Sequence, residues 1–495
     1  MRIAIVHFHL QTGGVTRVIQ HACETLASAG HSVLVLTGEA PAHALGISAK
    51  VAVLAGLGYE ERRAQQTPDE LAAALVDTAR AQLGSAPDIW HIPNHCLGKN
   101  LILPGALMRL ARGGHRLLLQ PHDFAEDGRP ALYRRLRDRL GDGDVSRLSA
   151  LLYPLAPQIH YAVLNERDQS FLAAAGVPNA NLHLLANAVS ASAPTPEPEI
   201  EARSIGDAPQ PCNDAARLWL YPTRAIRRKN LGEFLLWSAL ADPRDRFATT
   251  QAPQNPQEQP RYRRWVELAA ELGLPVEFEL GTRVNDFQGL IASAHALVTT
   301  SVGEGFGLAF LEPWLSGRPL AGRDLPEITR DFRAHGITLD ALYQRLLVPL
   351  AWVDTKRLRV ALATGLAANA AAYGRRLDDD AEERAWRSAI TDARIDMGRL
   401  DEPAQEAVIR HLRGDPQARA DLVPSTLTAT TDDGIIAANA AAIRAGYGLS
   451  GYGRHLASIY GDIVNTTVSA RIDRADGDSL LGQFLAPERL TLLRT

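Results

Sequence analysis

Two glutamates, Glu304 and Glu312, stand eight positions apart in "SVGEGFGLAFLEPWLSGRPLAG", residues 301–322. Glycosidases use two carboxylates as an acid/base pair, held about 5 Å apart or about 6.5–9.5 Å apart. We expect a helix from about Leu308, which would put Glu312 more than one turn inside it. If the whole segment were helical, Glu312 would lie about 12 Å of rise from Glu304, and a non-helical turn at Glu304 would shorten this distance. Two carboxylates that hold different hydroxyls of one extended ligand therefore fit better than an acid/base pair.

Basic residues follow a predicted strand in "LYPTRAIRRKNLGEFLLW". The strand ends near Tyr221, and Arg224 and Lys229 lie in the loop before a helix. Basic side chains beside a helix N-terminus offer a resting place for a diphosphate. We expect Arg227 and Arg228 to be solvated charges only.

Five histidines follow predicted strands, and the carboxyl ends of parallel strands are where ligands bind. A cluster of this size could suggest a metal site, but no carboxylate–histidine motif supports one, so we favour polar lining of a cleft and expect no metal. These histidines are His7, His9, His91, His95 and His122.

A glycine pair, Gly13 and Gly14, lies between the first predicted strand and the first predicted helix. The pair either lets the backbone approach a phosphate or sugar at the helix N-terminus or forms an ordinary tight turn. It is not a GxGxxG fingerprint, so a dinucleotide cofactor gains little support. We expect no cofactor.

The composition is that of a large globular protein. The chain has 495 residues, 46% of them hydrophobic, which favours two or three domains. The 52 basic and 56 acidic residues give a net charge of −4 and no support for nucleic-acid binding. The three cysteines (Cys23, Cys96 and Cys212) lie far apart, so neither a disulfide framework nor a zinc site is indicated.

The start of the chain, "MRIAIVHF", is a strand pattern rather than a secretory signal. No apolar run approaches the roughly 20 residues that span a bilayer. We expect a soluble cytoplasmic protein with no membrane span.

Short apolar runs alternate with helical patterns along the first 200 residues. "RIAIVHF", "SVLVLT", "VAVLA", "DIWHI", "RLLLQ" and "YAVLN" are typical of buried strands, and a helix with Val15, Ile19 and Leu26 on one face follows the first of them. The alternation predicts an α/β fold with a parallel, doubly wound sheet over residues 1–200.

A second domain of the same kind is expected over residues 213–450, with strands at "RLWLYPT", "RFATT", "VEFELGT" and "ALVTTS". The proline-rich residues 190–212 separate the two as a linker. Residues 333–445 have a mostly helical pattern. "GYGRHLASIYGDIV" predicts a late helix within residues 451–495.

Four motifs together resemble those of a known family. "EGFGLAFLE" is similar to the E-x7-E motif of retaining glycosyltransferases of the two-domain GT-B type, most like glycosyltransferase family 4. "MRIAIVHFHLQTGGVTRVI" resembles that family's first strand and glycine loop, "LYPTRAIRRKN" its Arg…Lys diphosphate site, and "GYGRHLASIYGDIV" its crossover helix. The likeness covers about two thirds of the chain.

The resemblance implies two Rossmann-like domains facing a central cleft, the first on the acceptor side and the second on the donor side, with residues 333–445 as a large helical insertion and residues 451–495 returning to the first domain. It implies transfer of a sugar from a nucleotide-diphosphate sugar, with retention of configuration and no divalent metal, to a small-molecule or glycan acceptor. The apolar stripes of the insertion could pack on the second domain, cover the cleft or form a subunit interface. We favour packing on its own domain, and a monomer or a homodimer is expected.

The resemblance also implies roles for the residues at matching positions. Arg224 and Lys229 would neutralise the diphosphate, Glu304 would hold sugar hydroxyls and Glu312 the ribose, and His122 would lie near the transferred sugar. The catalytic set is His122, Arg224, Lys229 and Glu304. The donor-binding set is Gly13, Gly14, Asn187, Arg224, Lys229, Glu304, Gly305, Phe306, Gly307, Leu308 and Glu312.

The acceptor side depends on the charged segment "HDFAEDGRPALYRRLRDRL", which is longer than the usual family loop. Its arginines either form a solvated helix face or turn Arg129 or Arg134 towards an anionic acceptor, next to Asp123.

Three other functions compete with the transferase. A GT-B phosphorylase and a nucleotide-sugar epimerase are enzymes of related kind, although an epimerase needs carboxylates that converge on one ring carbon. A non-catalytic nucleotide-sugar-binding protein is the third, and the charged groups of the expected site weigh against it.

Overall fold

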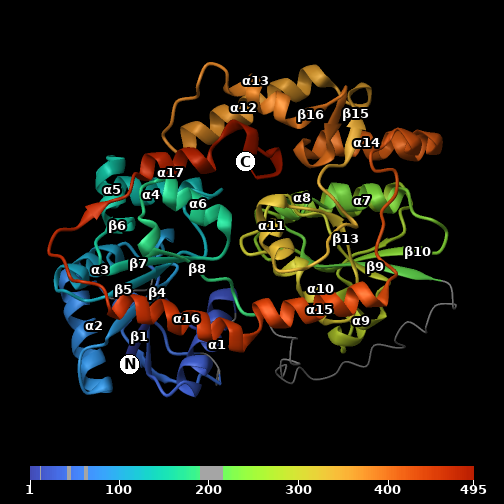
Figure 1. The fold of residues 1–495 in the computed structure, drawn as a ribbon. Helices are drawn as coiled ribbons and strands as arrows, with labels where there is room; N and C mark the ends of the chain where they lie inside the picture. The colour runs from blue at the N-terminus through green and yellow to red at the C-terminus, as the bar shows by residue number, and fades with distance from the viewer. Residues whose placement is uncertain (12, 42–45, 61–64, 190–215, 495) are drawn as a thin grey trace. The chain divides into compact units, whose positions relative to one another are not determined.

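The computed structural model describes residues 1–11, 13–41, 46–60, 65–189 and 216–494, so the expected linker at 190–212 and Cys212 lie outside the described residues. The chain forms two compact units, and each consists of separate stretches of sequence (Figure 1). Unit 1 holds Met1–Ala188, Asn369–Arg376 and Ala445–Ala486, and unit 2 holds Val189–Ala368, Leu377–Arg444 and Pro487–Thr495.

A seven-stranded, all-parallel sheet organises unit 1, in the order β3-β2-β1-β4-β5-β7-β8. The strands β1, β4, β5 and β7 are almost wholly buried, which explains their unbroken apolar sequences. Their bounds are β1 Arg2–His7, β2 Ser32–Thr37, β3 Lys50–Val53, β4 Ile89–Pro93, β5 Leu117–Gln120, β7 Ile159–Val163 and β8 Leu182–Leu184.

Helices cover both faces of this sheet. On one face α1 packs against α16, where Ile19 and Leu456 join one apolar cluster. On the other, residues of α2, α3 and α5 share a larger cluster with residues of α17. The helices of unit 1 are α1 Gly14–Ser28, α2 Pro68–Leu83, α3 Leu103–Arg112, α4 Pro130–Leu140, α5 Val145–Leu152, α6 Glu166–Ala174, α16 Leu449–Val464 and α17 Gly477–Phe484.

Unit 2 is built on a six-stranded parallel sheet in the order β11-β10-β9-β12-β13-β14. The predicted strand "VEFELGT" shortens to two residues, because a 3-10 turn at Leu280–Thr282 follows it. The strands are β9 Arg217–Arg224, β10 Asp245–Gln251, β11 Val276–Glu277, β12 Ala296–Thr299, β13 Leu320–Arg323 and β14 Leu342–Tyr343.

Helices α7, α8, α13 and α14 of unit 2 pack apolar side chains into one cluster with this sheet. The helices of unit 2 are α7 Leu231–Ala239, α8 Gln259–Glu271, α9 Phe287–Ser293, α10 Glu312–Leu315, α11 Pro326–Ala334, α13 Ala381–Ala389 and α14 Glu402–Gly414. Two further helices, α12 Thr355–Ala372 and α15 Asp433–Tyr447, begin in unit 2 and end in unit 1.

The stretch 333–445 is helical for the most part, and it packs into the core of unit 2 through side chains such as Leu346 and Leu358. It also holds short strands that its alanine-rich sequence does not predict. β14 joins the main sheet of unit 2, and β15 Leu347–Pro349, β17 Arg394–Asp396 and β16 Ile390–Thr391 form an antiparallel sheet of their own. The end of the chain adds β18 Asp473–Arg474, which pairs with β6 Pro154–Leu155.

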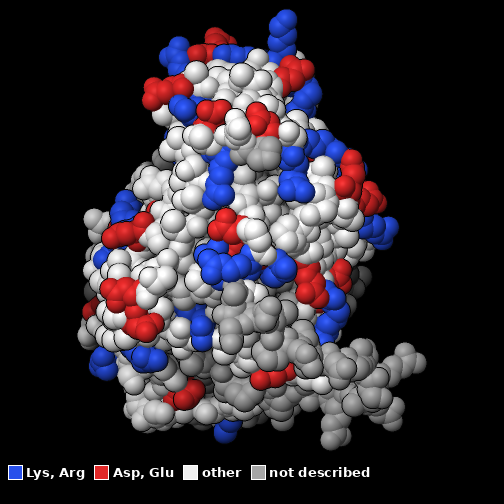
Figure 2. Space-filling model, turned by 90° about the vertical axis from the view of Figure 1, so that its right-hand side faces the viewer, with Lys and Arg blue, Asp and Glu red and all other residues white. Residues whose placement is uncertain are grey.

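Each sheet has a point at which the strand order reverses. In unit 1 it lies between β1 and β4, and in unit 2 between β9 and β12. Ligands of open α/β sheets bind at such points, beyond the carboxyl ends of the strands. The face drawn in Figure 2 carries basic and acidic side chains interspersed, in keeping with the near balance of charge.

Candidate active site

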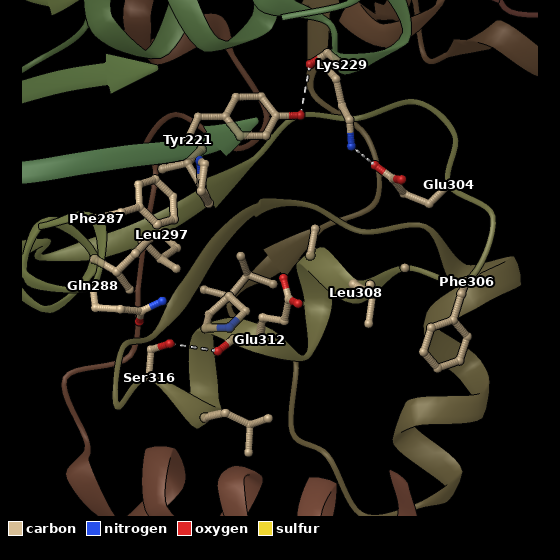
Figure 3. Close-up of a pocket in the computed structure, with 18 residues that line it drawn as sticks. Tyr221, Lys229, Phe287, Gln288, Leu297, Glu304, Phe306, Leu308, Glu312 and Ser316 are labelled. Atoms are coloured by element: carbon tan, nitrogen blue, oxygen red, sulfur yellow. Dashed lines mark hydrogen bonds and ion pairs between the residues drawn. The ribbon is translucent and has the colours of Figure 1, made fainter. Parts of the chain in front are cut away.

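A cavity of about 390 Å³ opens in unit 2, and residues of β9, α9, β12 and the segment 304–316 line it. In the view of Figure 3, Lys229 and Glu304 lie at one end of it, Phe287 and Gln288 lie at the other, and Glu312 lies between them. The lining is therefore charged at one end and largely apolar at the other.

The charged end is a buried ion pair with a second cation beside it. The ammonium of Lys229 contacts Oε1 of Glu304, and a guanidinium nitrogen of Arg228 lies 3.0 Å from Oε2. The side chains of Lys229 and Glu304 are only 14% and 10% exposed. Burial opposes the charge of both, yet the neighbouring cations hold the pKa of Glu304 below its ordinary value, whereas burial lowers the pKa of Lys229.

The loop that carries Lys229 is held by residues far along the chain. Arg227 donates two hydrogen bonds to Glu402, at 2.5 and 2.9 Å, and its backbone N–H donates to Glu258 at 3.0 Å. The expectation that Arg227 and Arg228 are merely solvated is therefore wrong, because both guanidiniums meet carboxylates at the site or behind it. Glu402 begins α14, and no local sequence signal links it to this loop.

Asn230, next to Lys229, has left-handed backbone and sits in a buried polar network. Its amide nitrogen donates to Glu233, and its amide oxygen accepts from Gln405, both at 2.8 Å. The hydroxyl of Thr300 contacts the carbonyls of Lys229 and Asn230 at 2.9 and 3.0 Å. The loop is thus fixed from two sides before any ligand enters.

Glu312 does not lie inside a helix that starts at Leu308, and that expectation is wrong. A 3-10 turn covers Leu308–Phe310, and α10 begins at Glu312 itself. Pro313 explains the break, because it lacks an N–H and suits only the first turn of a helix. Gly307 has a φ of 94°, and a Cβ there would lie 2.7 Å from Ile328, so only glycine fits this position.

Some of the predicted donor-binding residues line the cavity, and others lie outside it. Phe306, Gly307 and Leu308 line the cavity with Glu304 and Glu312. Arg224 does not line it: it ends β9 with an exposed side chain, 3.4 Å from the Gln251 amide oxygen. Arg228 does not line the cavity, but its guanidinium contacts Glu304, which does.

The point at which the strand order of unit 1 reverses carries buried, neutral histidines instead of charged side chains. His91 lies 2.8 Å from the Gln120 amide and 2.9 Å from the Tyr460 hydroxyl, and His7 lies 3.3 Å from the Pro93 carbonyl. Burial lowers the pKa of His7 to about 3 and that of His91 to about 4.

His122 follows β5 at the same edge, and burial, with a smaller effect of His91, lowers its pKa to about 3. Within the described ranges its Nε2 is buried with no hydrogen-bond partner. The neighbouring Asp123 receives a hydrogen bond from Arg129 at 2.5 Å. Arg134 donates to the Ala372 carbonyl at 3.5 Å.

The remaining predicted positions lie in unit 1 as well. Gly13 precedes α1 with an extended backbone and no side-chain cap, and Gly14 begins the helix. Asn187 lies near the end of the first stretch of unit 1, and its amide oxygen is buried without a partner among the residues that the structure describes. His9 contacts the Tyr59 hydroxyl at 2.8 Å, and His95 contacts the Leu152 carbonyl at 2.8 Å.

Within the described residues no three His, Cys, Asp or Glu side chains are grouped so that they could hold a metal ion. Asp142 and Asp144 have an Asp-x-Asp spacing, but Asp142 pairs with Arg147 at 3.0 Å and Asp144 caps α5 by accepting from the Ser146 N–H. Both carboxylates thus have structural partners.

Comparisons with known proteins agree with this architecture. Residues 13–188 match the family described as glycosyl transferase 4-like domain. Over 380 residues the chain is 26% identical to a protein of Petrotoga mobilis named mannosylglucosyl-3-phosphoglycerate synthase, and the match spans 72% of this chain and 70% of that protein.

Two solved structures share the fold at 13% identity. One is a glycosyltransferase from Rickettsia africae, with a TM-score of 0.52 over 94% of this chain and 99% of that one. The other is Anabaena HepE in complex with UDP, with a TM-score of 0.51 over 92% and 99%. The two-domain GT-B fold that the sequence predicts is confirmed. Among the described helices, none has both the length and the apolarity needed to cross a membrane.

Proposed function

The chain is a GT4-like glycosyltransferase of the GT-B type, and from this premise we propose that it moves a sugar from a nucleotide-diphosphate sugar to a small anionic acceptor. The proposal includes retention of the anomeric configuration and independence of divalent metal. The observation that carries it is the cavity of unit 2, which holds the Lys229–Glu304 ion pair, with Arg228 beside it, at one end and is largely apolar at the other.

The cationic end suits the diphosphate. Lys229 and Arg228 both pair with Glu304, so an entering diphosphate would give these cations a further anionic partner. Charge-assisted hydrogen bonds of this kind stabilise the negative charge that develops on a leaving group. The exposed guanidinium of Arg224, at the end of β9, would meet the diphosphate from outside the cavity.

The rest of the cavity suits the nucleoside and the sugar. Phe287 and Ile291, which both line the cavity, offer apolar contact for a base. Glu312 lies between Phe287 and the phosphate end, where ribose hydroxyls would be (Figure 3). Glu304 would hold hydroxyls of the transferred sugar. Backbone N–H groups of the glycine turn, at Phe306 and Gly307, complete the donor site.

The neutral edge of unit 1 suits hydroxyl recognition. The unpartnered Nε2 of His122 can accept a hydrogen bond from a sugar hydroxyl or donate one to it, according to its tautomer. An imidazole with a pKa of about 3 stays neutral through the physiological range, so it would orient the sugar without adding charge. Asp123, one residue further, would accept a bond from an acceptor hydroxyl.

The acceptor class comes from the relative in Petrotoga mobilis, whose name describes a product that contains phosphoglycerate. We propose that the acceptor of this chain is likewise a small glycoside of an acidic phosphate ester. The direct contact of Arg129 or Arg134 with that anion stays a prediction.

The reaction breaks the bond between the anomeric carbon and the diphosphate oxygen and forms a bond from that carbon to the acceptor oxygen on the same face. The electron pair of the broken bond leaves with the diphosphate. The acceptor hydroxyl proton goes to the departing phosphate oxygen, so charge and atoms balance without a metal or a redox partner.

The test is to incubate the purified chain with UDP-, GDP- and ADP-sugars, GDP-mannose among them, and with glucosyl-3-phosphoglycerate as acceptor. We expect transfer with one of these donors and a product of retained configuration by NMR. Thermal stabilisation by nucleoside diphosphates screens the donor base, because a ligand at 100 times its Kd adds about 2.7 kcal/mol. An inverted product would contradict the mechanism, and binding of a donor without transfer would contradict the acceptor class.

A further inference from the structure

One short segment of the second half of the chain belongs to unit 1. Residues Asn369–Arg376 lie in unit 1, although the stretches before and after them belong to unit 2. The segment is the C-terminal end of α12 and the turn that follows. Its contacts reach the loop after β5, which carries His122 and Asp123, and the helices α4 and α17.

The end of α12 is built for close docking. The N–H of Gly374 bonds to the Ala371 carbonyl at 3.0 Å, and that of Arg375 bonds to the Ala370 carbonyl at 2.8 Å. This is the Schellman motif, with Gly374 in the left-handed conformation at a φ of 70°. A Cβ on Gly374 would collide with the guanidinium of Arg137, so glycine serves both the turn and the close approach.

Arginines of α4 hold the carbonyls at this helix end. Arg134 donates to the Ala372 carbonyl and Arg137 to the Tyr373 carbonyl, each at 3.5 Å. Cations near a helix C-terminus are favourable, because the last carbonyls lack intrahelical partners and carry partial negative charge. The basic face of α4 is therefore occupied in part by a segment of its own chain.

Tyr373 places its side chain in the core of unit 1 and uses its hydroxyl twice. The ring is 1% exposed and packs on Tyr133 with centroids 5.2 Å apart. The hydroxyl accepts from the Arg129 N–H at 2.7 Å and donates to the Ala125 carbonyl at 3.2 Å. One hydroxyl thus ties together two points of the loop after β5.

The Arg129 side chain carries this constraint to Asp123. Its guanidinium donates to the carbonyls of Phe124 and Asp127 at 3.1 Å and to the Asp123 carboxylate at 2.5 Å. On the far side, the Asp123 N–H donates to the side chain of Asn94 at 3.1 Å. Fixing the Arg129 backbone therefore fixes the direction of the Asp123 carboxylate.

We infer that Tyr373 is a positioning residue for the acceptor: through Arg129 it holds the loop after β5 so that Asp123 meets the acceptor hydroxyl. This rests on the proposed function, which gives Asp123 its acceptor contact. A stretch that the family resemblance treats as an insertion thereby contributes to the acceptor side of the site.

Tyr133 provides a matched control. It is 1% exposed, as Tyr373 is, and it packs against the same ring, but within the part of the chain that the structure describes its hydroxyl has no partner. Tyr133→Phe removes a hydroxyl that makes no bond, and Tyr373→Phe removes one that makes two. The aromatic packing stays in both variants.

The experiment compares the two variants of the full chain with glucosyl-3-phosphoglycerate as acceptor. We expect Tyr373→Phe to raise the acceptor KM about tenfold, the change that loss of a net hydrogen-bond contribution near 1.4 kcal/mol produces. The kcat at saturating acceptor and the donor KM should stay within twofold, and Tyr133→Phe should change none of the three. Equal acceptor KM values for the two variants would overturn the inference.

Two further measurements keep the inference separate from the proposed function and from folding. Amide hydrogen exchange at Arg129 should be at least tenfold faster in Tyr373→Phe than in Tyr133→Phe, and equal rates would overturn the inference even if the wild type transfers no sugar. Arg129→Lys keeps the charge but cannot meet Phe124, Asp127 and Asp123 together. Arg129→Lys should also raise the acceptor KM and leave kcat and the donor KM unchanged. If Tyr373→Phe does not fold, an unchanged acceptor KM in Arg129→Lys would overturn the inference.

Discussion

The reversal points of the two sheets have opposite electrostatic character. In unit 2 a lysine and an arginine meet a glutamate at the end of the cavity, and the pKa of that glutamate is held below its ordinary value. In unit 1 the corresponding edge holds imidazoles whose pKa values burial lowers to about 3 or 4. The same topology therefore presents fixed charge in one unit and neutral hydrogen-bonding groups in the other.

Under the proposed function, this difference would suit the charged and the uncharged groups of the reactants. A diphosphate that leaves with an electron pair needs cations that are already in place, and the polar network behind Lys229 keeps them there. Sugar and acceptor hydroxyls carry no charge, and neutral imidazoles can orient them without attracting counter-ions. Each prediction below removes one side of this contrast.

We expect the largest loss of activity from a substitution at the charged end of the cavity in unit 2. Lys229→Met should lower kcat/KM for the donor by about 10³-fold, in the range found when one preorganised contact to developing charge is removed. Arg224→Met is the control for a cation outside the cavity and should lower kcat/KM for the donor less. Steady-state kinetics with the best nucleotide sugar measure both, and equal losses would show that the buried cation has no special role.

Substitutions of Glu304 and Glu312 should affect different kinetic constants. Glu304→Gln should lower kcat by about 10²–10³-fold, because contacts near the reacting carbon strengthen as positive charge develops there. Glu312→Gln should mainly raise the donor KM, by about tenfold for the loss of about 1.4 kcal/mol of uniform binding. Separate kcat and KM values test the split, and a common effect on kcat would remove the distinction between sugar and ribose contacts.

The buried histidines of unit 1 predict a pH dependence of the free energy of unfolding. The unfolded chain binds a proton at His91 below about pH 6.5, whereas the folded chain does so only near pH 4. The free energy of unfolding should therefore fall as the pH is lowered from 6.5 to 4, by about 1.4 kcal/mol per pH unit for this group. Above pH 6.5 the contribution of His91 to stability is complete.

Urea denaturation at pH 7 and pH 5, on the wild type and on His91→Gln, isolates this contribution. The variant should lose less stability between the two pH values than the wild type. A steeper loss in the variant would mean that His91 is protonated in the folded chain.

No effect at all is expected from metal removal. Because Lys229, Arg228 and Arg224 supply the positive charge, transfer should proceed at an unchanged rate in EDTA. Assays with EDTA and with added Mg²⁺ or Mn²⁺ decide this, and strict dependence on either ion would contradict the assignment of the diphosphate site.

The sequence predicts the parts of this molecule that local pattern determines. The strands "DIWHI" and "RLLLQ" appear as β4 and β5, and the late helix appears as α16, because unbroken apolar runs and a helical apolar stripe depend on few long-range contacts. In each case the relevant spacing is visible in the chain.

Other features depend on contacts that no local pattern records. Glu402 and Gln405 of α14 contact Arg227 and Asn230, and 175 residues separate the two partners in each pair. Tyr373 reaches the loop after β5 in the same way, from 244 residues beyond Arg129. The break before α10 was predictable in principle, because Pro313 follows Glu312 directly.

The central claim is that the cavity of unit 2 holds a nucleoside diphosphate through Lys229. Calorimetric titration of UDP, GDP and ADP into the wild type and into Lys229→Met tests it without an acceptor or a reaction. We predict micromolar or tighter binding of one diphosphate to the wild type and a loss of at least tenfold, or about 1.4 kcal/mol, in the variant. The same Kd for both proteins, or no binding of any of the three to the wild type, would contradict the account.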